Sequence, residues 1–239
     1  AKGRPFGFLD HNLRSGDSLL GIHRLVQLTQ LSMNPNSQGQ LCLFGQNIEA
    51  AVREAIKLRK RLRTMTIRDI KDVETMARLD LEARRKLESV ELIADAMIGE
   101  ALSCGGNART LDSVLASLAS DVATFLHGDE NMGAGIAYRT RTNLAIELPE
   151  KETAHKPFHW AIEFPEVIES LAGGFNVVIG NPPWASYSGR QAAELKSADR
   201  KYYSSQYRLF GKWKALHSLF IERSLSISCK ESSLGILLP

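Results

Sequence analysis

The sequence contains little cysteine, no long hydrophobic run and no signal segment, and each absence excludes a class of protein. Its three cysteines, Cys42, Cys104 and Cys229, are odd in number and far apart, which excludes a disulfide framework and a Cys-x-x-Cys zinc site. The apolar run at residues 175–179 is far shorter than the roughly 20 residues that span a bilayer. No basic start leads into a hydrophobic segment, as a secretory signal requires. We therefore expect a soluble cytoplasmic protein without a membrane partner or a bound metal.

The charge of the chain is nearly balanced overall but is clustered locally. A formal net charge of +3 favours an anionic partner only weakly. Between residues 53 and 68, the single acid Glu54 stands among seven basic residues: Arg53, Lys57, Arg59, Lys60, Arg61, Arg63 and Arg68. Such a cluster can neutralise phosphates, and we expect Arg59, Lys60 and Arg63 to contact DNA. The alternative is an ordinary solvated helix face.

Hydrophobic spacing predicts that residues 22–156 are mainly helical. Apolar residues recur at steps of three and four from Ile48 to Met65, which places the basic cluster on the other face. A second long run reaches residue 97, so two adjacent helices should form a hairpin. Residues 104–107 break this run, a further helix is expected at 111–126, and the glycine-containing stretch 128–135 is expected to be a loop.

The remaining residues, 157–239, have the pattern of a parallel α/β sheet. Residues 175–180 form an apolar, β-branched run typical of a strand that is buried on both faces. Residues 207–227 have helical spacing, and residues 234–238 form another apolar run. Strand, helix and strand in this order predict adjacent parallel strands, whose ligands bind beyond the carboxyl ends of the strands. Asn181 lies at such an end.

The tetrapeptide Asn181, Pro182, Pro183 and Trp184 suggests a particular chemistry. Two prolines stop strand pairing and fix the backbone that follows. The amide oxygen of Asn181 and the carbonyl of Pro182 can each accept one hydrogen of an exocyclic amine while Trp184 stacks on the ring, as a flipped-out base would require. No Pro-Cys dipeptide and no zinc deaminase signature is present, so we expect direct methyl transfer to the amine.

Longer segments around the tetrapeptide resemble a known family. Residues 158–167 (FHWAIEFPEV) and 174–184 (GFNVVIGNPPW) are similar to the catalytic region of gamma-class N6-adenine DNA methyltransferases, in particular the type IIG restriction-modification and BREX-like enzymes. Residues 8–21 (FLDHNLRSGDSLLG) resemble the third motif of this family. The helix and strand that follow the catalytic loop in the family are matched by residues 207–213 (YRLFGKW), 219–225 (LFIERSL) and 234–239 (LGILLP).

The resemblance implies an α/β fold that is helix-dominated overall. A partial Rossmann-like methyltransferase sheet would consist of residues 1–21 and 157–239, with a large helical insertion at residues 22–156. The implied function is site-specific methylation of adenine in double-stranded DNA, with S-adenosylmethionine as the cofactor and the target adenine flipped out. Asp17 matches an acid that lies beside the adenine of the cofactor, and we expect Tyr187 and Arg190 to contact DNA.

The sequence also departs from the family pattern. Relatives tend to carry an acid and a tyrosine where this chain has Lys214 and Leu216. The cofactor's glycine-rich loop and ribose-binding acid should precede residue 1, so we expect missing N-terminal and C-terminal domains of the same polypeptide and no tight cofactor binding or DNA methylation by this chain alone. Two alternatives stay open: an amino methyltransferase of protein glutamine or RNA, and a degenerate methyltransferase-like module for DNA binding or assembly.

Overall fold

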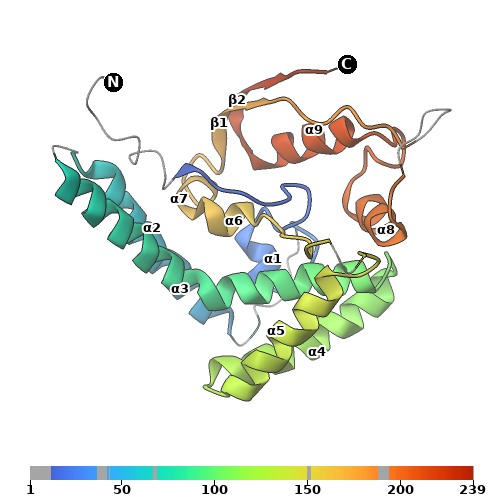
Figure 1. Cartoon of the computed structure of the whole chain (residues 1–239), viewed down its shortest axis with the longest axis horizontal. Coiled ribbons are helices and arrows are strands. Elements are labelled where there is room, and N and C mark those ends of the chain that lie inside the picture. Colours follow the sequence, from blue (N-terminus) through green and yellow to red (C-terminus); the bar gives the residue numbers. More distant parts are fainter. Residues whose placement is uncertain are drawn as a thin grey trace.

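The computed structural model describes residues 12–36, 42, 44–66, 69–149, 152–187 and 194–238. Figure 1 shows a helical part, made of helices α2 to α5, and a smaller part that contains strands β1 and β2. Three short helices lie between the two parts: α1 (Leu25–Thr29), α6 (Trp160–Glu163) and α7 (Pro165–Ile168). The described chain is therefore helix-rich, with a small parallel sheet at one side.

Helices α2 (Gly45–Thr64) and α3 (Ile70–Ser103) form the predicted hairpin. The spacing of apolar residues is confirmed, because Ile48, Val52 and Ala55 are all buried on one face of α2. Helix α3 begins after Asp69, whose carboxylate accepts hydrogen bonds from the first backbone N–H groups of the helix. With 34 residues, α3 is about 50 Å long. This length lets it contact α2, α5 and α8 (Ser197–Gln206) along its course.

Helices α4 (Ala108–Leu126) and α5 (Glu130–Leu144) form a second pair. The predicted helix at 111–126 is confirmed, but the loop expected at residues 128–135 is confined to residues 128 and 129, since α5 begins at Glu130. The Asp129 carboxylate accepts a hydrogen bond from the Met132 N–H and so caps this helix. A Cβ atom on Gly133 would lie 2.6 Å from the ring of Phe125. This glycine therefore serves close helix packing and not a turn.

The sheet consists of β1 (Phe175–Gly180) and β2 (Ser228–Ile236), which are parallel. In their register, Ile179 lies opposite Gly235 and Gly180 opposite Ile236. Helix α9 (Leu216–Ile227) connects directly to β2, so the predicted order of strand, helix and strand is confirmed. The helix begins at Leu216, because residues 207–215, which were expected to be helical, are mostly turns.

Strand β1 is not buried on both faces, contrary to its apolar sequence. Val177 is 56% exposed and Ile179 is 83% exposed, whereas Phe175 and Val178 pack against the core. Among the described residues, β1 has a single paired neighbour, β2. The strand therefore carries apolar side chains that the described residues leave exposed.

One hydrophobic cluster joins the helical part to the residues around the sheet. It contains Leu20 from the first predicted segment, Ile93 and Leu118 from the middle one, and Tyr207 and Leu219 from the last one. Side chains from all three predicted segments share this core. The domain boundaries expected after residues 21 and 156 stay a prediction. Within the described ranges, no helix is both long and apolar enough to span a membrane.

Candidate active site

The predicted catalytic tetrapeptide follows directly after β1, at its carboxyl end. Asn181, Pro183 and Trp184 are exposed, and Pro182 is buried. The exposed fraction of Trp184 is 57%, which is high for an indole, because tryptophan is usually well buried. In the described part of the chain, the side-chain amide of Asn181 has no hydrogen-bond partner. The loop thus presents an amide and an indole face to a ligand.

A pocket of about 280 Å³ lies at this end of the sheet. Its walls come from β1 and the loop, from helix α9 and from two residues that are distant in sequence, Ser18 and Trp160. The polar groups of the wall come from Asn181, Ser18, Ser224 and Arg223, and most of the other lining side chains are apolar. This combination of an apolar lining with a few convergent polar groups is usual for small-molecule sites.

The loop is held from one side by residues 214–216. The Tyr187 N–H donates to the Lys214 carbonyl at 2.6 Å, and the Leu216 N–H donates to the Ala185 carbonyl at 2.8 Å. The Tyr187 ring lies 6.3 Å from the Phe210 ring, and Tyr187 is not among the residues that line the pocket. Burial, together with the carboxylates of Asp199 and Asp17, raises the pKa of Tyr187. Tyr187 therefore packs against Phe210 and does not line the pocket. Its expected contact with DNA stays a prediction.

Asp17 forms a tight turn beside the pocket. Its Oδ1 atom accepts hydrogen bonds from the N–H groups of Leu19 at 2.9 Å and Leu20 at 3.4 Å. The backbone of Asp17 pairs with that of Pro157, so the start and the end of the predicted insertion lie side by side. Ser18, the next residue, lines the pocket. The structure thus brings Asp17 within one residue of the pocket that Asn181 lines.

A second acid near Asp17 was not predicted from the sequence. Asp199 is buried near the start of α8, and its Oδ1 atom lies 3.4 Å from Nε2 of His155. Burial raises the pKa of the Asp199 carboxyl, although His155 opposes this effect, and Asp17 raises it further. Helix α8 was not predicted from the sequence, although its buried residues Ala198, Tyr202 and Tyr203 recur at a helical spacing.

Arg223 of α9 lines the pocket and is hydrogen-bonded to Gly21 and His23, which are far from it in sequence. It is 6% exposed and donates to neutral acceptors: the Tyr207 hydroxyl at 2.7 Å, the Gly21 carbonyl at 3.3 Å and Nδ1 of His23. Burial, and then the positive charges of Arg223 and Arg24, lower the pKa of His23 from 6.5 to about 2. His23 therefore stays neutral in the folded protein and accepts a hydrogen bond from the arginine.

This arrangement predicts acid sensitivity. A histidine whose pKa is depressed by folding stabilises the protein above its unfolded pKa, and this contribution is lost as the pH falls. Between about pH 7.5 and about pH 5.5, His23 should remove about 1.4 kcal/mol from the free energy of unfolding. Urea denaturation of the wild type and of His23→Gln at both pH values measures this loss. Glutamine can still accept the hydrogen bond but does not titrate, so equal losses in the two proteins would contradict the assignment.

The sequence of the whole region, from the helical part to β2, matches one family model. The model is described as Eco57I restriction-modification methylase, and it matches residues 42–239. The chain belongs to the Eco57I restriction-modification methylase family. None of the curated proteins and none of the solved structures gives a significant match.

Membership of the Eco57I family indicates a methyltransferase of the restriction-modification type. The matched residues include the predicted catalytic tetrapeptide, α8, α9 and both strands. They also include α2 to α5, so the helical part lies within the family pattern. Asp17 lies outside the matched residues, and its assignment depends on its own resemblance and on its place beside the pocket.

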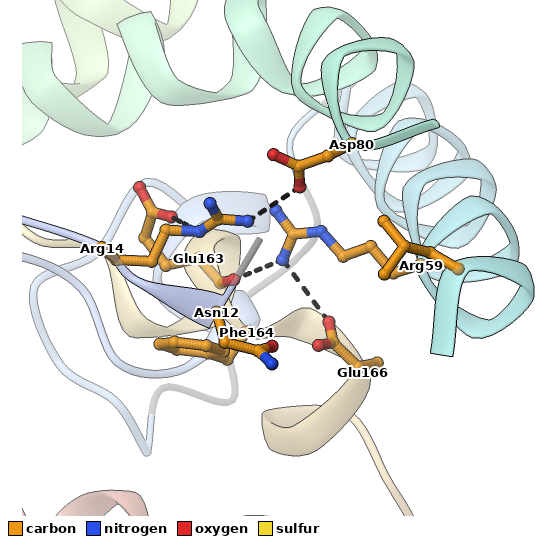
Figure 2. Close-up of a pocket in the computed structure, with 8 residues that line it drawn as sticks. Asn12, Arg14, Arg59, Asp80, Glu163, Phe164 and Glu166 are labelled. Atoms are coloured by element: carbon orange, nitrogen blue, oxygen red, sulfur yellow. Dashed lines mark hydrogen bonds and ion pairs between the residues drawn. The ribbon is translucent and has the colours of Figure 1, made fainter. Parts of the chain in front are cut away.

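Arg59, one of the residues predicted to contact DNA, is buried in this Eco57I-family chain. The Arg59 side chain is 7% exposed and lies 3.4 Å from the Glu166 carboxylate, and it also donates to the Glu163 carbonyl. Figure 2 shows Arg59 directed inward, toward Glu163 and Glu166 of the segment that precedes β1. Arg59 is therefore not part of a DNA-facing surface in this structure. Its spacing indicates this place, since position 59 continues the buried series Val52 and Ala55.

Arg14 completes the same cluster. It lies 2.9 Å from Asp80 of α3 and 3.1 Å from Glu163, and its side chain is 4% exposed. Although burial works in the other direction, hydrogen bonds from Arg14 and Arg84 hold the pKa of Asp80 below its ordinary value. The cluster connects the α2–α3 hairpin to Arg14, which precedes Asp17, and to the segment with Glu163 and Glu166, which precedes β1 (Figure 2).

The other predicted DNA contacts are placed only in part. Lys60 is exposed on α2, as expected. The side chain of Arg63 and the whole of Arg190 lie outside the described residues, as do residues 8–11 of the segment around Asp17. Contacts of Lys60, Arg63 and Arg190 with DNA stay predictions.

Proposed function

We propose that this chain is part of a site-specific DNA methyltransferase that transfers a methyl group from S-adenosylmethionine to the exocyclic amine of adenine. The observation that carries the proposal is the position of the tetrapeptide at the carboxyl end of a parallel strand, where Asn181, Pro182 and Pro183 line a pocket and the exposed Trp184 follows them. Family membership supports methyl transfer within a restriction-modification system.

The loop suits an amine that is bonded to an aromatic ring. Such an amine is a poor nucleophile because its lone pair is delocalised. The Asn181 amide oxygen and the Pro182 carbonyl can each accept one of its hydrogens, which localises the lone pair on nitrogen. The same oxygens stabilise the positive charge that develops on nitrogen as the new bond forms. The exposed indole of Trp184 provides a stacking surface for the extruded base.

S-adenosylmethionine would supply an electrophilic methyl group at this site. Ser18 and Trp160 line the pocket on the side of Asp17, and Trp160 donates from its indole N–H to the Ser18 carbonyl at 3.3 Å. These residues fit the adenine end of the cofactor, where the resemblance places Asp17. A glycine-rich loop for the methionine end does not occur in the 239 residues. The described residues therefore fit one part of the cofactor.

We further propose that β1 and β2 are neighbouring strands of a larger Rossmann-like sheet. The exposed side chains of Val177 and Ile179 support this, because a sheet with helices on both faces would bury them. The groove beside this face, of about 380 Å³, is lined by aromatic side chains, including Phe158, Trp160 and Phe164.

The test is an acceptor comparison. The complete protein is incubated with a labelled methyl donor and with DNA, RNA and a glutamine-containing protein in parallel. We expect label in DNA. Label in RNA or in protein would favour the amino methyltransferase alternative, and DNA binding without any transfer would favour the DNA-binding or assembly module.

A further inference from the structure

The segment that clamps the catalytic loop carries an exposed aromatic and basic surface. Lys212, Trp213 and Lys214 are consecutive and all exposed, and Trp213 is 59% exposed. Neither lysine is in an ion pair with a described residue. The sequence pattern predicts a helix here, but α9 begins only at Leu216.

The backbone under this surface is rigid. The Trp213 N–H donates to the Leu209 carbonyl at 2.8 Å, and the Trp213 carbonyl accepts from the Ala215 N–H at 2.8 Å and from the Ser218 hydroxyl at 2.9 Å. An indole on a fixed backbone loses little conformational freedom when it binds a partner, so the entropic cost of the contact is small. A single exposed aromatic residue is common on protein surfaces, but Trp213 stands between two exposed lysines.

The local charge favours an anionic partner. Arg208 lies in the same segment and lines a groove of about 360 Å³ together with Lys212. The nearest acid, Glu222, also lines this groove, but its two oxygens accept hydrogen bonds from the N–H groups of Arg208 at 2.9 Å and Leu209 at 2.8 Å. The positive charges of the segment are therefore only partly offset.

The segment is joined to the catalytic loop. An antiparallel bridge links Ser186 to Ala215, and two backbone hydrogen bonds flank it. Trp184 lies two residues before one end of this bridge, and Trp213 lies two residues before the other. Because the pairing is antiparallel, these two positions lie on opposite sides of the bridge, about 13 Å apart along the strands at about 3.3 Å per residue. A nucleic acid strand that places one base against Trp184 and follows the bridge therefore passes Trp213 farther along.

We propose that Lys212, Trp213 and Lys214 bind the DNA strand that flanks the target nucleotide, with Trp213 stacked on a base and the two lysines on phosphates. The proposal rests on the proposed function, since it takes the tetrapeptide as the loop that holds the flipped base. Base stacking on an exposed aromatic ring and phosphate neutralisation by lysine are the two contacts that protein surfaces offer to an opened strand.

The test measures DNA affinity without a methyl donor. Fluorescence anisotropy of a labelled duplex is followed over a range of salt concentrations for the wild type, Trp213→Ala, Trp213→Phe and Lys212→Ala/Lys214→Ala. The matched control is Lys71→Ala/Lys230→Ala, which removes two exposed lysines on α3 and β2. Near-ultraviolet circular dichroism confirms that each variant is folded.

We expect Trp213→Ala to weaken binding by about tenfold at an unchanged salt slope, with recovery in Trp213→Phe. The double lysine variant should lower the salt slope by about 2, and the control should leave affinity and slope as in the wild type. Affinities and slopes equal to those of the wild type, or no DNA binding by the wild type, would overturn the proposal. The expected losses without any methylation of DNA would support this surface and refute the proposed function. Lost methylation at unchanged affinity would refute the surface alone.

Discussion

Replacement of Asn181 by alanine is expected to lower the rate of methyl transfer to DNA by about a hundredfold to a thousandfold. The alanine variant removes one of the two oxygens that accept the hydrogens of the target amine, so less positive charge on nitrogen is stabilised in the transition state. The rest of the loop should stay in place, because its backbone is held by Lys214 and Leu216 and the Asn181 side chain has no partner among the described residues.

Single-turnover methylation by the complete protein measures this effect, with DNA affinity measured in parallel. Asn176→Ala is the matched control, because Asn176 is an exposed asparagine on β1, the strand that precedes the loop, and its amide lies 3.5 Å from the sulfur of Cys229. We expect the control to react at the wild-type rate and both variants to bind DNA as the wild type does. A fast Asn181→Ala enzyme would remove this amide from the mechanism.

The second large effect is expected at Arg14. Arg14→Met leaves Glu163 without its closest guanidinium and removes one of the two arginine partners of Asp80. Breaking a buried ion pair on one side costs about 3–5 kcal/mol, because a buried charge is left unpaired. Chemical denaturation should therefore show a large fall in the free energy of unfolding.

Arg53→Met provides the comparison for this prediction. Arg53 is exposed on α2 and pairs with Glu49 at 3.6 Å, and such surface pairs contribute about 1 kcal/mol or less. If the Arg14 and Arg53 variants lose the same stability, the buried cluster does not stabilise the packing of the α2–α3 hairpin on the segment that precedes β1.

The elements with a strong hydrophobic period were predictable from the sequence. The apolar spacing of α2, the run of β1 and the break after α3 each depend on local pattern, and all three are in place. Only residues 128 and 129 of the loop predicted at 128–135 lie outside a helix, because Gly133 makes room for the Phe125 ring and does not form a turn. Which role a glycine has depends on its neighbour in space.

The candidate site was predictable only where its residues are consecutive. Asn181 to Trp184 form one short motif, so their chemistry can be deduced from the sequence. Arg223 reaches the pocket, and Asp199 the neighbourhood of Asp17, through tertiary packing, and a single sequence carries no record of such contacts. Arg59 was assigned to the surface by its charge, although its spacing follows the buried face.

The position of the transferred methyl group tests the central claim most directly. DNA that has reacted with the complete protein and a deuterium-labelled methyl donor is digested to nucleosides, which are analysed by mass spectrometry. We expect the label in N6-methyl-2′-deoxyadenosine, and its loss in the Asn181→Ala variant. Label on cytosine, or label on adenine that does not depend on Asn181, would contradict a site in which this loop holds the amine of a flipped adenine.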